Sequence, residues 1–231
     1  MLAPSPVGSI ILVLATLSAA GCQGTEPTGP IEPVERLSPE EHDTRGHADL
    51  KAGRFEDAIA HFNSSLAAHP QDEPHHWPRG IAYYYAGEYA KGVRQFELHR
   101  TVNPADVENA VWHFLCKAKL DGIPAAQDAI LPVGQDRRVP MMTVYEMFAG
   151  RSTPDDVLQE AESTGMPEHQ AESARFYAHL YVGLYHEILG EADRARHHIT
   201  MAAQTHTSTH YMGDLARMHA GMLGRGVRSE R

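Results

Sequence analysis

The sequence predicts an all-α protein: a helical solenoid of about five helix pairs, with a C-terminal covering helix and no sheet. Two observations lead to this prediction. Gly, aromatic and Pro residues recur at a fixed spacing in the first half of the chain, and apolar residues elsewhere follow the period of a helix. With 231 residues, 42% of them hydrophobic, the chain is long enough to bury a continuous core.

The recurring residues are separated by 34 positions, which relates residues 39–72 to residues 73–106. Gly46, Gly53, Phe55, Ala58, Phe62 and Pro70 return as Gly80, Gly87, Tyr89, Gly92, Phe96 and Pro104. A period of 34 residues is that of the tetratricopeptide repeat (TPR), whose unit is a pair of helices. We expect the first Gly of each unit to let its two helices approach closely and the second to end the first helix. One pair cannot cover its own apolar face, so the pairs must stack.

The rest of the chain predicts a continuation of this stack as far as residue 225. Residues 107–165 read as degenerate repeats, in which Thr153 and Pro154 have the residue types of a helix start. A clearer repeat returns over residues 169–207, and residues 210–223 predict the helix that covers the open end. Residues 226–231 are expected to be a disordered tail.

The N-terminal residues predict export and lipidation. Residues 1–21 contain no charged side chain, and their apolar run is too short to span a bilayer of about 30 Å but suits a signal peptide. The run from Leu17 to Cys22 resembles a bacterial lipobox, which implies that Cys22 carries the lipid (a palmitate-type acyl anchor). Residues 22–38, rich in Pro, Gly and Glu, are expected to form a flexible tether. A plain secretory signal and an uncleaved anchor remain as alternatives.

Four segments resemble the NlpI family of TPR lipoproteins in their order and spacing. They are RGIAYYYAG at 79–87, FLC at 114–116, VYEMFAGRSTPDDVL at 144–158 and FYAHLYVGLYHEILGEADRARHH at 176–198. The resemblance implies a lipid-anchored protein on the periplasmic side of the bacterial outer membrane. It also implies a non-catalytic adaptor or scaffold that recruits a protease or cell-wall hydrolases, and a homodimer. This chain has fewer residues before its repeats than members of that family have. The rival interpretation is a TPR lipoprotein that acts as a pilotin in secretin or pilus assembly.

The composition and motifs argue against other classes of function. A formal net charge of -10 disfavours nucleic acid and anionic lipid surfaces as partners, so membrane contact is expected through the lipid anchor only. No nucleophile motif, P-loop or dinucleotide turn is present, and Cys116 is expected to be a buried core residue, so we predict neither an enzyme nor a cofactor. The 16 histidines lack zinc-ligand spacing, which leaves a His-rich metal-binding protein as a distant alternative.

The concave face of the stack is the best candidate for a binding site. In TPR stacks the first helix of each pair lines this face, and aromatic residues there are typical anchors for a partner protein. The repeat register places seven residues on it: Trp77, Ile81, Tyr84 and Tyr85 from the second pair, with His47, Leu50 and Lys51 from the first. We expect periplasmic proteins to bind there. The alternative is that the chain's own tail or a neighbouring helix fills this face.

Overall fold

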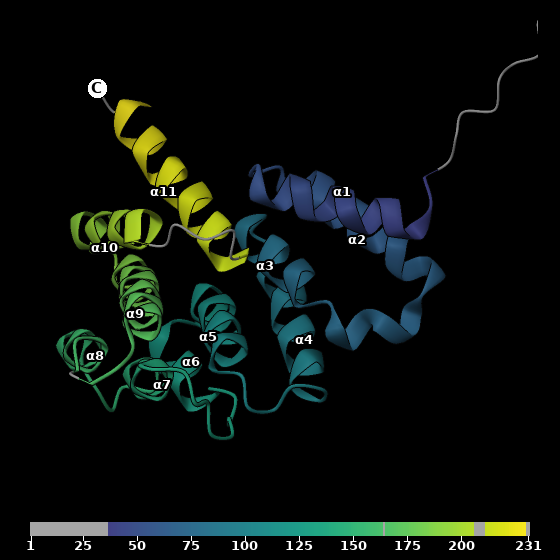
Figure 1. Cartoon of the computed structure of the whole chain (residues 1–231). Helices are drawn as coiled ribbons and strands as arrows, with labels where there is room; N and C mark the ends of the chain where they lie inside the picture. The colour runs from purple at the N-terminus through teal and green to yellow at the C-terminus, as the bar shows by residue number, and fades with distance from the viewer. Residues whose placement is uncertain (1–36, 164, 206–210, 230–231) are drawn as a thin grey trace, which may run out of the picture. The chain divides into compact units, whose positions relative to one another are not determined.

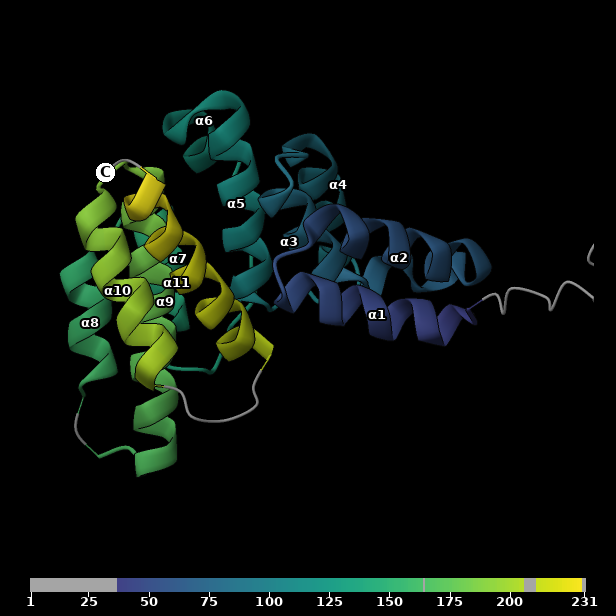
Figure 2. The same ribbon diagram turned by 90° about the horizontal axis from the view of Figure 1, so that it is seen from above.

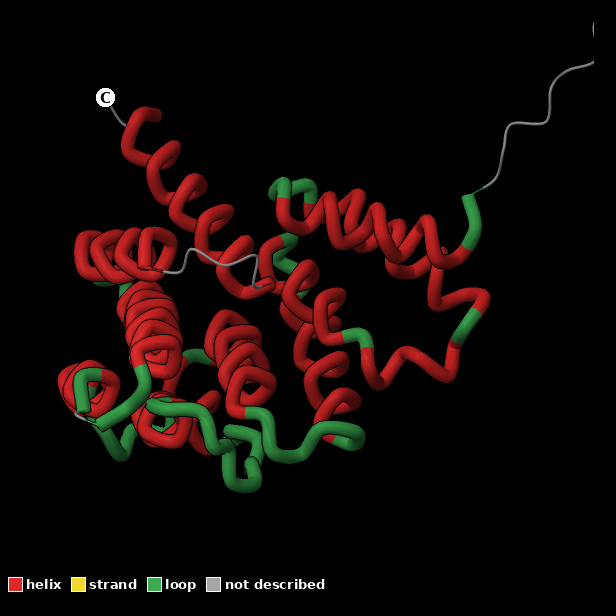
Figure 3. The backbone as a smooth tube through the Cα atoms, in the orientation of Figure 1, coloured by secondary structure: helices red, strands yellow, loops and turns green. Residues whose placement is uncertain are grey.

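The computed structural model describes residues 37–163, 165–205 and 211–229, and within these ranges it contains helices and no strand (Figures 1 and 3). The elements in chain order are α1 (Pro39–Lys51), α2 (Phe55–Ala68), the 3₁₀ helix η1 (Pro70–His75), α3 (Trp77–Tyr85), α4 (Tyr89–Arg100), α5 (Val107–Asp121), α6 (Ile123–Asp128), α7 (Met141–Phe148), α8 (Pro154–Ala161), α9 (Glu168–Ile188), α10 (Ala192–Thr205) and α11 (Tyr211–Ser229). The predicted signal peptide, Cys22 and nearly all of the tether lie outside the described residues. None of the described helices is long and apolar enough to cross a membrane.

Consecutive helices pack against each other as pairs, so the all-α prediction with packed adjacent helices is confirmed. The pairs in the described part are α1 with α2, α3 with α4, α5 with α6, α7 with α8, and α9 with α10. Neighbouring pairs are joined in turn, since α2 contacts α3, α4 contacts α5, α5 contacts α7, and α8 contacts α9. The buried apolar side chains form one hydrophobic cluster that runs from Leu50 to Met218.

The same turn ends the first helix of four pairs. Gly53, Gly87, Gly150 and Gly190 have φ angles of 75° to 78°, in the left-handed region that favours glycine. At the first of these turns, the Gly53 N–H donates to the Leu50 carbonyl at 3.1 Å and the Arg54 N–H donates to the Asp49 carbonyl at 2.9 Å. The corresponding two bonds recur at the other three glycines. This is the Schellman arrangement, which satisfies carbonyls at a helix end.

A second glycine contact sets the distance between the helices of three pairs. Each glycine lies against the residue that follows it by sixteen positions: Gly46 against Phe62, Gly80 against Phe96, and Gly183 against Ile199. A Cβ atom placed on these glycines would stand 2.5, 2.7 and 2.8 Å from the partner side chain. The partner residues are almost fully buried. Close approach of the two helices therefore requires the glycine, as the 34-residue pattern predicts.

Two segments differ from the sequence-based expectation. Residues 70–75 form the 3₁₀ helix η1, which the sequence analysis did not predict, and Pro74 lies inside it. At the C-terminus, α11 continues to Ser229 and so extends into the residues predicted as a tail.

The last helix does more than cover the end of the stack. It packs against α10, and it also contacts α1 at the other side of the described unit. Figures 1 and 2 show α11 passing between the α1–α3 region and the α9–α10 region. Its buried apolar side chains are Met212, Leu215, Ala216 and Met218.

Candidate functional site

The structure brings the seven predicted binding residues together, but three of them belong to the core. Leu50 and Ile81 have no exposed surface, and Tyr84 is 6% exposed. The Tyr84 ring packs edge to face against Trp112, with centroids 5.4 Å apart. We therefore correct their assignment, because side chains that are fully or almost fully buried offer little surface to a partner.

The other four predicted residues contact the chain's own last helix. Their contacts are as follows: His47 Nδ1 with the Tyr211 hydroxyl at 2.9 Å, Lys51 Nζ with Asp214 Oδ2 at 2.9 Å, the Trp77 ring with the Tyr211 ring at 4.9 Å between centroids, and the Tyr85 hydroxyl with His219 Nδ1 at 2.8 Å. The face lined by these residues is thus filled by α11, which is the alternative that the sequence left open.

Charged groups determine how α11 sits on this face. The buried His219 lies between Tyr85 and Glu187, and its Nε2 atom is 2.8 Å from Glu187 Oε2. Burial alone would raise the pKa of Glu187, but the His219 contact lowers it below its ordinary value. In the same way burial raises the pKa of Asp214, whereas hydrogen bonds from Lys51 and Arg217 bring it below the ordinary value. Both carboxylates are therefore ionised near pH 7 and fix the position of α11.

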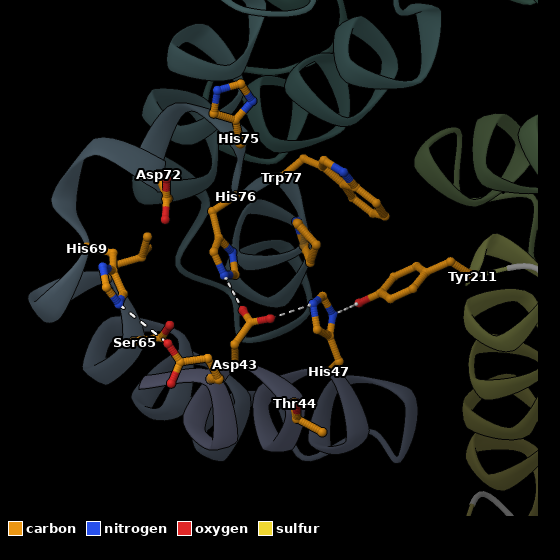
Figure 4. A pocket seen from close by; sticks show the side chains of 13 residues that line it. Asp43, Thr44, His47, Ser65, His69, Asp72, His75, His76, Trp77 and Tyr211 are labelled. Carbon is orange, nitrogen blue, oxygen red and sulfur yellow. Dashed lines mark hydrogen bonds and ion pairs between the residues drawn. The ribbon is translucent and has the colours of Figure 1, made fainter. Parts of the chain in front are cut away.

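An open cleft remains beside the first turn of α11 (Figure 4). We call it the histidine–carboxylate cleft, and its volume is about 670 Å³. It lies between α1, the end of α2, η1 and the start of α3. Its lining residues are Glu40, Asp43, Thr44, His47, Ser65, Leu66, His69, Asp72, His75, His76, Trp77, Pro78 and Tyr211.

A chain of polar contacts between Tyr, His and Asp side chains crosses the cleft (Figure 4). It runs from the Tyr211 hydroxyl to His47, from His47 Nε2 to Asp43 Oδ2 at 3.4 Å, and from Asp43 Oδ1 to His76 Nε2 at 2.9 Å. Burial lowers the pKa of His47 and of His76, although Asp43 acts in the opposite direction on both. The imidazoles are therefore neutral near pH 7. A neutral His47 can accept the phenol proton at Nδ1 and donate from Nε2 to Asp43.

The cleft carries negative charge at neutral pH. Glu40, Asp43 and Asp72 contribute carboxylates, while the half-buried His47 and His76 contribute no charge. Such a surface attracts positively charged groups. Burial raises the pKa of the Tyr211 phenol, so this side chain acts as a hydrogen-bond donor in its protonated form.

The described residues give less support to metal binding or to a reactive cysteine. Within them, no group of three or more His, Cys, Asp or Glu side chains is placed to hold a metal ion. Cys116 lies fully buried in α5, where a Cβ on Gly92 would stand 2.6 Å from its sulfur. Burial raises the pKa of its thiol, which disfavours the reactive thiolate.

Sequence reasoning missed Asp43, His76 and Tyr211 as members of one site. The spacing of Asp43 and His47 by four positions on a helix was a usable signal, because such residues lie on the same face. Tyr211 gave no such signal, since 164 positions separate it from His47.

No protein-family model matches this sequence, and no curated protein matches it either. The repeated helix pairs, the face covered by α11 and the open cleft are therefore the grounds on which a function can be argued.

Proposed function

We propose that this protein is a non-catalytic TPR scaffold that binds a segment of another protein in the histidine–carboxylate cleft. The observation that carries the proposal is the repeated construction of the helix pairs. Pairs α1–α2, α3–α4 and α9–α10 share both the glycine turn and the close glycine contact. Repetition of one two-helix unit is typical of solenoids that bind other proteins along their inner surface.

The cleft has the dimensions and the lining that a protein segment needs. Its volume of about 670 Å³ lies in the range of ligand pockets. Trp77 provides a half-buried aromatic surface, and Thr44 and Asp72 are exposed at its edge. His76 Nδ1 is buried and has no hydrogen-bond partner among the described residues.

The charge of the cleft indicates the kind of segment that it accepts. Three carboxylates face neutral histidines, so a segment with Lys or Arg gains electrostatic attraction. Some of these carboxylates are exposed to water, so the attraction should weaken as the salt concentration rises. The partner we propose is a basic, extended or helical segment of a periplasmic protein.

The cellular place of this binding follows from the N-terminal sequence. The lipobox resemblance at Cys22 and the tether at 22–38 support an outer-membrane lipoprotein whose folded part faces the periplasm. The adaptor role is thus the recruitment of periplasmic proteins to that membrane.

Site-specific photo-crosslinking in cells tests the proposal. A photo-reactive amino acid at Thr44, which is exposed and lines the cleft, should capture a defined partner. The same probe at Ala60, which is exposed on α2 outside the cleft, is the matched control. We expect Asp72→Arg to weaken binding of the purified partner about tenfold, because it reverses a charge at the edge of the cleft. Equal crosslinking at Thr44 and Ala60 would contradict the proposal.

A further inference from the structure

A smaller cavity lies behind the Trp77–Tyr211 pair. Its volume is about 200 Å³, and its lining residues are Trp77, Ile81, Phe96, Asp106, Glu108, Asn109, Trp112, Arg138, Tyr177, Tyr211 and Met212. Trp77 and Tyr211 also line the histidine–carboxylate cleft. Their rings meet edge to face, and the two spaces share this pair as part of their lining.

Two polar atoms of the cavity residues lack hydrogen-bond partners. They are Asn109 Oδ1 and Trp112 Nε1, and no described residue bonds to either. Asn109 is 4% exposed and Trp112 is 2% exposed, so bulk water does not replace the missing partner. Asn109 Nδ2 already donates to the Phe96 carbonyl at 3.0 Å, which leaves Oδ1 as the free end of the amide. An unpaired buried polar atom costs about 1–3 kcal/mol.

One ligand group with both a donor and an acceptor can pair with these two atoms. Asn109 Oδ1 accepts a hydrogen bond and Trp112 Nε1 donates one. The residues are three positions apart on α5, so they lie on the same face of the helix. A primary carboxamide offers the matching donor and acceptor side by side. Since a water molecule occupies about 30 Å³, the cavity has room for a whole side chain.

Charged residues that line the cavity determine which charge on a ligand group is favoured. Arg138 contacts three carboxylates: Asp106 at 2.9 Å, Asp136 at 2.6 Å, and Glu108, which also accepts a hydrogen bond from Tyr181. The Arg138 side chain is 39% exposed, and Arg138, Asp106 and Glu108 all line the cavity. Because carboxylates outnumber the guanidinium, a carboxylate on the ligand is repelled. A neutral amide on the ligand is not repelled.

We propose that this cavity binds the carboxamide side chain of a glutamine or asparagine that belongs to the partner segment. The proposal rests on the proposed scaffold function, because it assigns that residue to the protein bound in the cleft. The amide N–H donates to Asn109 Oδ1, and the amide oxygen accepts from Trp112 Nε1. The aromatic and aliphatic walls, among them Trp77 and Ile81, cover the apolar stem.

The chain provides its own reporter for the test. It contains only two tryptophans, and both line the cavity. The two indole N–H signals in an NMR spectrum therefore report directly on its occupancy. The probe is N-acetyl-glutamine N-methylamide, added to the full protein. For a ligand of this size we expect saturable shifts with a dissociation constant on the order of millimolar.

Matched probes and variants make the result specific. The glutamate analogue has almost the same shape and should bind at least about tenfold more weakly, because its carboxylate has no N–H to donate to Asn109 Oδ1. Asn109→Leu and Trp112→Phe should each weaken glutamine-probe binding about tenfold. Asn63→Leu, at an amide outside the cavity, is the control and should leave it unchanged. Circular dichroism shows which variants are folded.

Three outcomes would overturn the carboxamide assignment. The first is a norleucine analogue that binds as well as the glutamine probe, and the second is an arginine analogue that binds more tightly. The third is that the indole N–H signals do not shift when the glutamine probe is added. Tighter binding of free glutamine than of the capped probe would overturn the assignment to a protein partner. The crosslinking at Thr44 tests the scaffold function separately. A partner captured there, without any shift of the indole signals, would reject only this inference.

Discussion

Gly80 shows how one residue sets the distance between two helices. A Cβ atom there would stand 2.7 Å from Phe96 Cζ and 2.8 Å from Cε1. Phe96 is 1% exposed and its ring lies directly against Gly80, so a larger side chain at position 80 has to displace that ring. We predict that Gly80→Leu lowers the free energy of unfolding by about 1–3 kcal/mol, because a close-packed core absorbs added volume only with strain. Urea denaturation followed by circular dichroism measures the change.

Gly224 provides the control for this substitution. It lies exposed in α11, and a Cβ atom there would meet nothing within 4 Å. Gly224→Ala should therefore raise stability by up to about 1 kcal/mol through helix propensity alone. If Gly80→Leu were as stable as the parent protein, the assigned repeat register would be wrong.

At the scale of elements, α11 depends on polar contacts to keep its place. The Tyr85 hydroxyl is 2.8 Å from Nδ1 of His219, which is 2% exposed. Tyr85→Phe leaves that nitrogen without its partner, and we predict a loss of about 1–3 kcal/mol in stability. Hydrogen exchange should become faster in α11 and stay unchanged in α2.

Tyr89 is the matched control for the hydroxyl. It is half-buried, and no hydrogen bond to its hydroxyl is present among the described residues. Tyr89→Phe should change stability by less than about 0.5 kcal/mol. Equal effects of the two substitutions would show that α11 is held by its apolar residues alone.

The elements themselves were largely predictable from the sequence, and their contacts with α11 were not. Local signals place the helix ends: the Ser38 and Thr153 caps and the four turn glycines each act within a few residues. Of the aromatic residues predicted on α3, Trp77 and Tyr85 contact α11, whereas Tyr84 lies in the core. Whether they meet a partner or the chain itself depends on contacts such as His47 with Tyr211, which span 164 positions. No period or cap encodes such a contact.

At the scale of the whole molecule, the histidines make stability depend on pH. Burial is the main cause that lowers the pKa of five of them below the ordinary 6.5: His47, His76, His113, His179 and His198, the last to about 4. In the unfolded chain these groups take up protons near pH 6.5, whereas in the folded protein they do so only at lower pH. Between these values the unfolded state binds more protons. The free energy of unfolding should therefore be highest above about pH 6.5, and it should decrease as the pH falls towards about 4.

Urea denaturation at a series of pH values from about 7 to about 4.5 checks this prediction. His198→Gln should flatten the dependence, because it removes a group whose pKa is lowered to about 4 by burial and by neighbouring histidines. A parent protein equally stable across this range would contradict the prediction.

The location of the molecule depends on Cys22, which lies outside the described residues. If a lipid is attached there, Cys22→Ser should move the protein from the membrane fraction to the soluble fraction, because acyl chains provide about 0.8 kcal/mol per buried CH₂. Cys116→Ala is the control and should leave the protein in the membrane fraction, since Cys116 is buried in the core. Mass spectrometry that finds an unmodified mature Cys22 would reject the lipid anchor.

The position of α11 has a consequence for affinity. A helix that covers a binding face and belongs to the same chain acts as an intramolecular competitor, whose effective concentration does not change when the protein is diluted. A ligand that needs this face binds only the fraction of molecules in which α11 has moved, and its apparent dissociation constant is larger by the inverse of that fraction. For a partner that needs this face, contacts of α11 such as Lys51 with Asp214 and Tyr85 with His219 would therefore lower the affinity without touching the partner.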